Sequence, residues 1–318
     1  MEYRRVGKSG LQISLLSFGS WLTFGSSLDI KLTERCMKYA FEQGVNFFDN
    51  AEVYADGVSE AIMGKILPSF NRMDVVVSTK IFWGGEGPNR VGLSRKHLVE
   101  GTKASLKRLD LDYVDILYCH RPDPETPVEE TVFAMNDLIR WGHTLYWGTS
   151  EWSADEIKQA HKTAKENNLI GPIVEQPLYN MLVREKVEHD FSDLYDTVGL
   201  GLTTFSPLAS GILTGKYNNG IPENSRLAQV GWLKQLEKKN GHLNQEVFDK
   251  IDKLDQFARN FGFKAHHLAI AWVMKNPRVS SVILGASRFP QLKDNLTAFD
   301  LYGKMKESDW AEVENMIG

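Results

Sequence analysis

The feature that most limits how this chain can fold is a series of eight short runs rich in β-branched and aromatic residues. The runs begin near Leu15, Asn46, Val75, Tyr113, Thr144, Ile173, Leu200 and Val279. Their starts lie 27 to 38 residues apart until a last step of 79 residues. A strand, a helix and two turns need roughly 30 residues, so this spacing predicts repeated β/α units. Eight such units predict a closed (β/α)8 TIM barrel, whose chemistry lies at the C-terminal ends of its strands.

The segments outside these runs complete the predicted α/β architecture. Residues 3–14 are predicted to form an N-terminal β-hairpin that covers one barrel end. A loop-rich stretch over residues 207–243, followed by two predicted helices, gives a long insertion between strands seven and eight. No low-complexity segment or linker divides the sequence. We therefore predict a single domain over residues 1–318.

Composition and charge argue against several classes of partner. The net charge of −4 gives no electrostatic reason to expect nucleic acid. No apolar run approaches the ~20 residues of a membrane span, which predicts no membrane insertion. The two cysteines, Cys36 and Cys119, have no metal-ligand spacing and cannot form a disulfide framework. We therefore expect no metal site and a reducing, cytoplasmic setting.

Four polar residues lie at or just beyond the ends of three consecutive runs, and we predict that they are catalytic: Asp49, Tyr54, Lys80 and His120. Burial of a phenol raises its pKa, whereas a nearby ammonium stabilises the phenolate. Lys80 would thus lower the pKa of Tyr54, and Asp49 would keep Lys80 charged. His120 would hydrogen-bond the substrate oxygen. The group would act as a tuned general acid for an oxygen that gains negative charge.

Each of these residues has a plainer interpretation when taken alone. Asp49 could be a cap, Lys80 a surface cation at a strand end, Tyr54 a loop aromatic and His120 a satisfied polar side chain. Their joint occurrence at successive strand ends favours the catalytic interpretation.

Three tryptophans, Trp21, Trp83 and Trp152, follow strands one, three and five. Packing in the core is one interpretation. Their position at the expected barrel mouth favours an apolar substrate pocket, which would also contain Tyr54 and His120.

The chain resembles the aldo-keto reductases over essentially its whole length. The likeness rests on Asp49-Asn50-Ala51-Glu52-Val53-Tyr54, Ser78-Thr79-Lys80, Asp115-Ile116-Leu117-Tyr118-Cys119-His120, Gly148-Thr149-Ser150, Glu175-Gln176, Ser206-Pro207-Leu208 and Gly285-Ala286-Ser287. Within that superfamily it is most similar to the branch of the voltage-gated potassium channel β-subunits and their bacterial relatives. Segments 80–85, 121–124, 146–150 and 211–217 carry this second likeness.

The resemblance implies an oxidoreductase that uses NADPH (NADP+) to reduce aldehydes or ketones to alcohols, without a Rossmann domain. In agreement, no G-x-G-x-x-G follows a strand and opens a helix. The implied cofactor-binding residues are Ser20, Trp21, Asp49, Ser150, Gln176, Phe205, Ser206, Pro207, Leu208, Ala209, Ser210, Lys216, Arg226, Gly285, Ser287, Gln291, Asp294 and Asn295.

Several of these residues have a specific implied role. Ser150 and Gln176 would hold the carboxamide, and Phe205 would stack on the nicotinamide. The loop over residues 206–210 would line the pyrophosphate. Lys216, Arg226 and Ser287 would meet the 2′-phosphate, while Gln291, Asp294 and Asn295 would flank the adenine. Two cations beside glycine-rich loops independently make a sensible phosphate clamp.

Two positions depart from the channel β-subunits. Glu151 stands where many relatives have Asn and channel β-subunits have Arg, which leaves open whether it weakens cofactor binding or points into solvent. His120 stands where channel β-subunits have Asn. It restores the usual reductase tetrad, which favours catalysis over slow sensing.

Two other functions compete with carbonyl reduction. The first is an NADPH-binding, redox-sensing regulatory subunit of a membrane channel or transporter, although Met1 leads directly into the hairpin without a pore-plugging extension. The second is a metal-dependent hydrolase using Asp49, Glu52, His120, Asp123 and Glu175, for which Lys80 would be an awkward central neighbour. The expected partner is a small carbonyl substrate, and the resemblance allows a homo-oligomer, a tetramer or larger.

Overall fold

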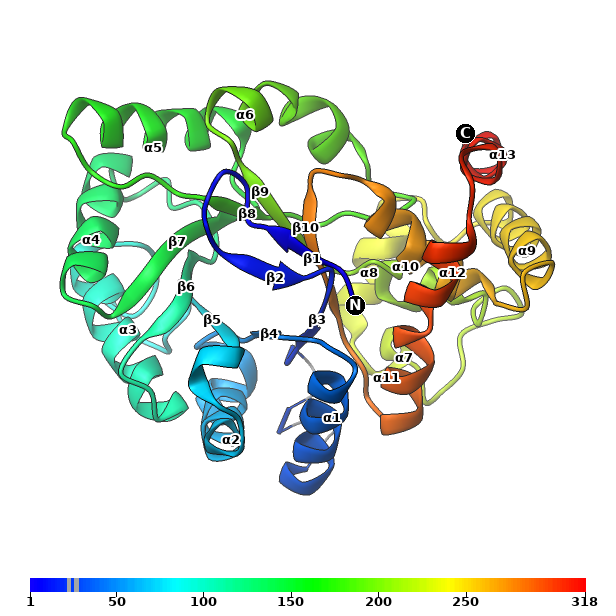
Figure 1. Cartoon of the computed structure of the whole chain (residues 1–318), viewed down its shortest axis with the longest axis horizontal. Coiled ribbons are helices and arrows are strands. Elements are labelled where there is room, and N and C mark those ends of the chain that lie inside the picture. Colours follow the sequence, from blue (N-terminus) through cyan, green and yellow to red (C-terminus); the bar gives the residue numbers. More distant parts are fainter. Residues whose placement is uncertain (22–23, 26–28) are drawn as a thin grey trace. The chain divides into compact units, whose positions relative to one another are not determined.

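Eight parallel strands close into a barrel in the computed structural model, which describes residues 1–21, 24–25 and 29–318 (Figure 1). The strands follow one another around the barrel as β3 (Leu16–Gly19), β4 (Phe47–Asp49), β5 (Val76–Ile81), β6 (Val114–Cys119), β7 (Thr144–Ser150), β8 (Val174–Gln176), β9 (Gly201–Thr204) and β10 (Val279–Leu284). β10 pairs with β3 and closes the ring. The predicted (β/α)8 TIM barrel is confirmed.

The chain divides into two units, each with its own internal contacts. Unit 1 comprises Met1–Pro177, Glu185–Phe205 and Arg278–Leu292, and it contains the whole barrel. Unit 2 comprises Leu178–Arg184, Ser206–Pro277 and Lys293–Gly318. The single domain expected over residues 1–318 stays a prediction.

The helices of unit 1 lie outside the barrel wall (Figure 1). They are α1 (Ile30–Glu42), η1 (Tyr54–Gly57), α2 (Val58–Ile66), η2 (Leu67–Ser69), η3 (Arg72–Asp74), α3 (Arg95–Leu109), α4 (Val128–Arg140), α5 (Ala154–Glu166), η4 (Lys186–Asp190) and α6 (Ser192–Thr197). A capping box opens α5, because Ser153 Oγ accepts from Glu156 N and Glu156 Oε2 accepts from Ser153 N.

Unit 2 contains the insertion predicted between the last two barrel strands. Its helices are η5 (Ala209–Thr214), α7 (Arg226–Gln229), α8 (Gly231–Lys239), α9 (Gln245–Arg259), α10 (Ala265–Lys275), α12 (Ala298–Lys304) and α13 (Glu307–Ile317), and α11 (Phe289–Leu296) begins in unit 1. Among the described residues, no helix combines the length and apolar character needed to cross a bilayer.

Burial on both faces explains the composition of the barrel strands. Every residue of β5 and of β6 is buried, as expected for parallel strands with side chains inside the barrel and helices outside. Inside, the Tyr118 hydroxyl lies 2.8 Å from Thr203 Oγ1, so a polar group in the barrel core is satisfied. The regular alternation of inward and outward side chains then determines which residues can reach the mouth.

The N-terminal hairpin, β1 (Tyr3–Arg5) and β2 (Gln12–Ser14), covers the N-terminal end of the barrel. Val6 and Ile13 are fully buried in one cluster with Phe47, Val76 and Val174, which begin their strands. The turn approaches the barrel closely, because a Cβ on Gly7 would lie 2.1 Å from Gly199 O. Its φ of +55° also favours glycine. The predicted covering hairpin is confirmed, and the opposite end of the barrel stays available for chemistry.

Glu175 of β8 points away from the barrel interior and is completely buried. Its Oε2 accepts a 2.5 Å hydrogen bond from Thr149 Oγ1. Burial raises the pKa of Glu175 from its ordinary value of 4.5 to about 8, despite the opposing effect of the Thr149 hydrogen bond. The folded protein therefore keeps a proton that the unfolded chain releases above about pH 4.5.

We predict that the free energy of unfolding decreases as pH rises from about 4.5 to about 8, because the unfolded state binds fewer protons in that window. At about 1.4 kcal/mol per pKa unit, the effect is on the order of a few kcal/mol. Glu175→Gln should remove this slope in urea melts at pH 5, 6.5 and 8, whereas the exposed control Glu223→Gln should keep it. An identical slope in the wild type and Glu175→Gln would contradict the assignment.

Candidate active site

The four predicted catalytic residues meet at the C-terminal end of the barrel, within unit 1. Asp49 ends β4, Lys80 lies near the end of β5, and His120 directly follows β6. Tyr54 begins η1, five residues after Asp49. Asp49, Lys80 and His120 are all buried. The three successive strand ends thus bring together the residues that the sequence pattern singled out.

The ammonium of Lys80 is completely enclosed, and each of its three hydrogens has an acceptor. Nζ donates to Asp49 Oδ2 at 2.6 Å, to the Asn50 carbonyl at 2.7 Å and to the Tyr54 hydroxyl at 3.2 Å. An ammonium has three donors and no acceptor, so this arrangement uses its full capacity. The Tyr54 hydroxyl accepts from Lys80, which leaves its own proton available for a ligand.

The carboxylate of Asp49 joins this group to two other strands. Its Oδ1 accepts from Ser78 Oγ at 2.7 Å and from Gln176 Nε2 at 3.1 Å. Gln176, at the end of β8, belongs to the predicted carboxamide site. A hydrogen-bonded chain therefore links one predicted cofactor residue to the proton donor through Asp49 and Lys80.

The electrostatics of Lys80 follow the sequence-based expectation. Burial disfavours its charge, but Asp49 and Tyr54 outweigh burial and raise the pKa of Lys80 above its ordinary value. The lysine therefore stays cationic.

The expected lowering of the Tyr54 pKa is not found in the free protein. Burial raises the pKa of Tyr54, and the positive charge of Lys80 opposes this effect without reversing it. The negative charge of Asp49 adds to the rise. Tyr54 therefore stays protonated at ordinary pH, as a proton donor must.

His120 is held in its neutral form. Burial, followed by the charges of Lys80 and Arg121, lowers its pKa well below the ordinary value. Its ring packs edge-on to Tyr54 at 5.8 Å and to Trp83 at 5.0 Å between centroids. A neutral imidazole carries one N–H and one acceptor nitrogen, so His120 can donate to an oxygen without adding charge.

The backbone after Tyr54 is strained. Ala55 and Asp56 both have left-handed conformations, with φ of 50° and 52°, and Gly57 follows at 84°. Non-glycine residues in this region cost about 1 kcal/mol or more each and concentrate at functional sites. The turn presents Tyr54 to the barrel mouth at a local energetic cost.

A buried pair behind the mouth holds the segment that carries Trp83. His97 Nε2 lies 3.3 Å from Glu52 Oε1, and the same oxygen accepts from Phe82 N at 2.7 Å. His97 Nδ1 lies 2.8 Å from the Gly92 carbonyl. Burial opposes the charge of His97, but Glu52 raises its pKa above the ordinary value. Both ends of the loop between β5 and α3 are therefore tied to one buried pair.

The predicted substrate tryptophans differ in their surroundings. Trp83 is half-buried and contacts both His120 and Phe82 through its ring. Trp152 is buried, and its Nε1 has no hydrogen-bond partner among the described residues. Trp21 is half-buried. Their role in a substrate pocket remains a proposal.

The predicted cofactor residues of unit 1 lie at the ends of its strands. Ser150 and Gln176 end β7 and β8, and Ser150 Oγ donates to the Gln176 carbonyl at 2.9 Å. Phe205 follows β9, while Gly285 and Ser287 follow β10. Ser287 N and Oγ both donate to Gln291 Oε1. Ser20 Oγ is buried and has no partner in the described part of the chain, as expected of a group that awaits a ligand.

In unit 2, the predicted pyrophosphate loop over residues 206–210 has an unusual backbone. Ser206, Ala209 and Ser210 have φ of 53°, 45° and 58°, and Pro207 and Leu208 lie between them. Gly211 continues the left-handed run at 95°. Successive right- and left-handed residues create concave nests of N–H groups that bind anions. The loop fits a phosphate-bearing ligand.

The two predicted phosphate-binding cations lie near the same tyrosine. Lys216 Nζ is 5.0 Å from the Tyr217 ring centroid, and Arg226, which starts α7, interacts electrostatically with the Tyr217 hydroxyl. Burial lowers the pKa of Arg226, so an anionic ligand would relieve the cost of its charge.

Two of the predicted adenine residues, Asp294 and Asn295, lie near the end of α11. Asn295 Nδ2 is buried without a partner among the described residues. Asp294 already pairs with His266 Nε2 at 2.8 Å and with His267 Nε2 at 3.2 Å. His267 Nδ1 accepts from Lys264 N, so its hydrogen is on Nε2 and points at Asp294. That tautomer suits a hydrogen-bonded cluster and not a metal ligand.

Glu151 does not extend alone into solvent. It has a left-handed φ of 60°, and its carboxylate lies 3.8 Å from Lys186 Nζ. The pairing compensates the acidic charge that sequence comparison raised as a concern.

Two further residues near the predicted sites were not expected from the sequence. Arg121 follows His120 at the same strand end and donates to Ser150 Oγ at 3.3 Å. Its position beside His120 was an available signal. Glu237 of α8 accepts from Ser210 Oγ at 2.7 Å. It lies 27 residues from Ser210, and no local pattern indicates that contact.

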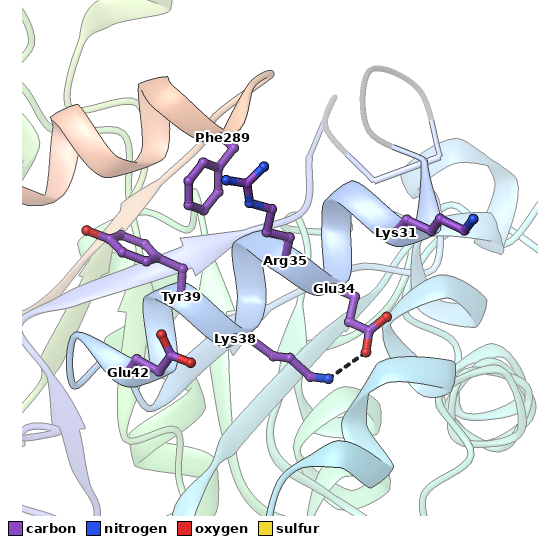
Figure 2. Close-up of a pocket in the computed structure, with 7 residues that line it drawn as sticks. All are labelled: Lys31, Glu34, Arg35, Lys38, Tyr39, Glu42 and Phe289. Atoms are coloured by element: carbon purple, nitrogen blue, oxygen red, sulfur yellow. Dashed lines mark hydrogen bonds and ion pairs between the residues drawn. The ribbon is translucent and has the colours of Figure 1, made fainter.

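A surface hollow of about 410 Å³ lies elsewhere on unit 1, along α1 (Figure 2). Within its lining, Lys38 pairs with Glu34 at 2.6 Å, and the Arg35 guanidinium carbon lies 3.9 Å from the Phe289 ring centroid. None of the predicted catalytic residues lines it.

Among the described residues, the side chains named for the hydrolase alternative do not have metal-ligand spacing. Within residues 1–21, 24–25 and 29–318, the one cluster with metal-ligand spacing is His266, His267 and Asp294. The five residues proposed for a hydrolase do not form such a group, and the Asp49 carboxylate is occupied by Lys80, Ser78 and Gln176.

Comparison with known proteins identifies the family. The model of the aldo/keto reductase family matches residues 15–317. This chain belongs to the aldo/keto reductase family. A probable voltage-gated potassium channel subunit beta of Arabidopsis thaliana is 56% identical over 320 residues, covering 100% of this chain and 97% of the relative. The corresponding protein of Oryza sativa subsp. japonica is 54% identical over 304 residues, covering 95% and 92%.

These matches confirm the resemblance to the family and to its channel β-subunit branch. Family membership makes the chain an oxidoreductase of a class that generally uses NAD(P)H. The nucleotide, the substrate and the roles of individual residues belong to the proposal that follows.

Proposed function

We propose that this aldo/keto reductase uses NADPH to reduce aldehydes or ketones to alcohols, with Tyr54 as the general acid. The observation that carries the proposal is the 3.2 Å hydrogen bond from Lys80 to Tyr54, with Lys80 held by Asp49 at 2.6 Å. A phenol is a useful acid where a fixed cation stabilises the phenolate that it leaves behind.

The chain's own residues fit the cofactor. Ser20, Trp21, Ser150, Gln176 and Phe205 would surround the nicotinamide half. Within unit 2, the 206–210 loop, Lys216 and Arg226 are the candidates for the phosphates, and Asp294 and Asn295 are candidates for the adenine. Within unit 1, Ser287 is a further phosphate candidate, with Gly285 and Gln291 also proposed to bind the cofactor. When bound, the reduced nicotinamide supplies a hydride to the carbonyl carbon.

The remaining steps belong to the catalytic group. His120, neutral and buried, donates a hydrogen bond that orients the carbonyl oxygen. Tyr54 transfers its proton to that oxygen as negative charge develops on it. Lys80 stabilises the resulting phenolate, and Asp49 keeps Lys80 charged and in place. Trp21, Trp83 and Trp152 would supply apolar walls that exclude water.

A reducing, cytoplasmic setting accompanies this proposal, because Cys36 and Cys119 are both buried free thiols. A homo-oligomer, tetrameric or larger, also belongs to it by analogy with the branch.

A second candidate is a regulatory subunit that reports redox state to a membrane channel. The names of the Arabidopsis and rice relatives favour it. The His120 side chain argues for turnover, because its neutral ring, which can donate a hydrogen bond, lies 5.8 Å from the Tyr54 ring between centroids.

We expect Tyr54→Phe to lower kcat for reduction of 4-nitrobenzaldehyde by about 10²–10⁴-fold, the range for losing a general acid. The dissociation constant for NADPH, measured by quenching of tryptophan fluorescence, should stay within about 2-fold, because Phe keeps the ring and removes only the hydroxyl. Tyr3→Phe, at the opposite end of the barrel, is the matched control and should keep full activity. Unaltered turnover in Tyr54→Phe would remove Tyr54 as the acid.

We also expect Lys216→Gln and Arg226→Gln to weaken binding of NADPH more than binding of NADH. Each lost charge-assisted contact to the 2′-phosphate should raise the KM for NADPH by about 10-fold or more. Lys253→Gln, exposed on α9, is the control. If the NADPH/NADH ratio of kcat/KM does not change in either variant, the phosphate assignment is wrong.

Turnover separates the two candidate functions. An enzyme should oxidise many equivalents of NADPH per chain with a simple aldehyde, at a rate on the order of 1 s⁻¹ or faster. A sensor should oxidise its bound cofactor once and then stop. The measurement is single-turnover absorbance at the nicotinamide band, compared with steady-state consumption in the same sample.

A further inference from the structure

The mouth of the barrel contains a second positive charge besides Lys80. Arg121 directly follows His120, and its Nη1 donates to the His120 carbonyl at 2.5 Å and to Ser150 Oγ at 3.3 Å. Its guanidinium carbon lies 5.4 Å from the centroid of the Trp83 ring. The Arg121 guanidinium thus lies between the ends of β5, β6 and β7, where the proposed reaction takes place.

Unlike Lys80, Arg121 has no acidic partner among the described residues. The neighbouring acid Asp123 is occupied, because its Oδ2 accepts from Leu93 N and Thr126 Oγ1 and its Oδ1 accepts from Glu125 N. Glu151, next to Ser150, lies 3.8 Å from Lys186. A half-buried guanidinium without a carboxylate keeps an uncompensated charge, which an anionic ligand can neutralise.

The geometry leaves part of the guanidinium available for such a ligand. Both hydrogen bonds of the guanidinium to described residues come from Nη1, and Nε and Nη2 donate to none of these residues. A guanidinium edge with two donors matches a carboxylate in a bidentate arrangement. The Trp83 ring provides a flat surface against the planar group.

The field of Arg121 also reaches the reacting groups. Its charge acts on both Tyr54 and His120, which bracket the expected position of the substrate oxygen. The chain as a whole has a net charge of −4, so it does not attract anions over long distances. Attraction of an anionic ligand by Arg121 is therefore local to the barrel mouth.

We propose that Arg121 binds an anionic group of the substrate, so that the preferred substrates are carbonyl compounds that carry a carboxylate. This inference rests on the proposed carbonyl reduction and specifies its substrate class. Such a substrate would place its carbonyl oxygen at Tyr54 and His120 and its carboxylate at the Nε and Nη2 edge of Arg121.

A structural role for Arg121 makes a different prediction. If the guanidinium only braced Ser150 and the His120 carbonyl, its loss would affect charged and neutral substrates alike. Discrimination between two substrates of the same shape therefore separates the two roles.

The test compares 4-formylbenzoate with its methyl ester, which keeps the ring and the aldehyde but has no charge. In the wild type, kcat/KM should be about 10–100-fold higher for the carboxylate than for the ester. One or two charge-assisted hydrogen bonds to the carboxylate account for a difference of this size. Arg121→Gln should abolish this preference and lower kcat/KM for the carboxylate far more than kcat/KM for the ester, while Arg121→Lys should retain part of the preference as a point charge. Arg140→Gln, exposed on α4, is the matched control and should behave as the wild type.

Two results would overturn the inference: equal kcat/KM for the two aldehydes in the wild type, or a preference that persists in Arg121→Gln. If the wild type reduces neither aldehyde, the proposed reaction fails. Calorimetry with 4-(hydroxymethyl)benzoate in the presence of NADPH, a pair that cannot exchange a hydride, then decides whether Arg121 binds the carboxylate. Binding to the wild type that Arg121→Gln loses would support the anion site, and absence of binding to the wild type would reject it.

Discussion

The structure of the site depends on the need to compensate a charge buried inside the barrel. Lys80 is fully enclosed, and an ammonium in that position is stable only with acceptors on all sides. Asp49, the Asn50 carbonyl and the Tyr54 hydroxyl supply those acceptors. The end of β4, the end of β5 and the start of η1 are thereby held in one arrangement. The same contacts that satisfy the lysine place a phenol where it can act as an acid.

Two cations at the barrel mouth have different electrostatic situations. Lys80 is neutralised by Asp49 and acts on the phenol that it touches, whereas Arg121 has backbone, hydroxyl and ring neighbours and no carboxylate among the described residues. Burial keeps His120 neutral, and both cations add to this effect because each disfavours a further positive charge. A neutral imidazole between two cations can donate a hydrogen bond to a substrate oxygen without competing for its negative charge. The division of roles follows from which cation has an acidic partner.

Much of the fold and of the catalytic group was accessible from sequence, because the relevant signals are local. The periodic strands, the capping box at Ser153 and the polar residues at successive strand ends all depend on short-range patterns and on the alternation of side chains. Contacts between distant segments were not accessible in this way. The pairing of Glu52 with His97, the contact of Glu237 with Ser210 and the proximity of Glu151 to Lys186 each join residues far apart in the chain. The direction of the Tyr54 pKa was wrong for a related reason, because the balance between burial and the charge of Lys80 depends on how completely the barrel encloses the phenol.

The amino-acid sequence alone determined the barrel, its covering hairpin and the order in which Asp49, Tyr54, Lys80 and His120 reach one end. Repeat spacing and strand alternation are properties of the covalent chain, so they can be read before any packing is known. Only the tertiary structure decided which charges are compensated. It showed that Lys80 has three acceptors, that Glu151 is paired and that Arg121 has no acid beside it among the described residues. Compensation depends on distances of a few ångströms between strand ends and loops, and those distances exist only after the chain has folded.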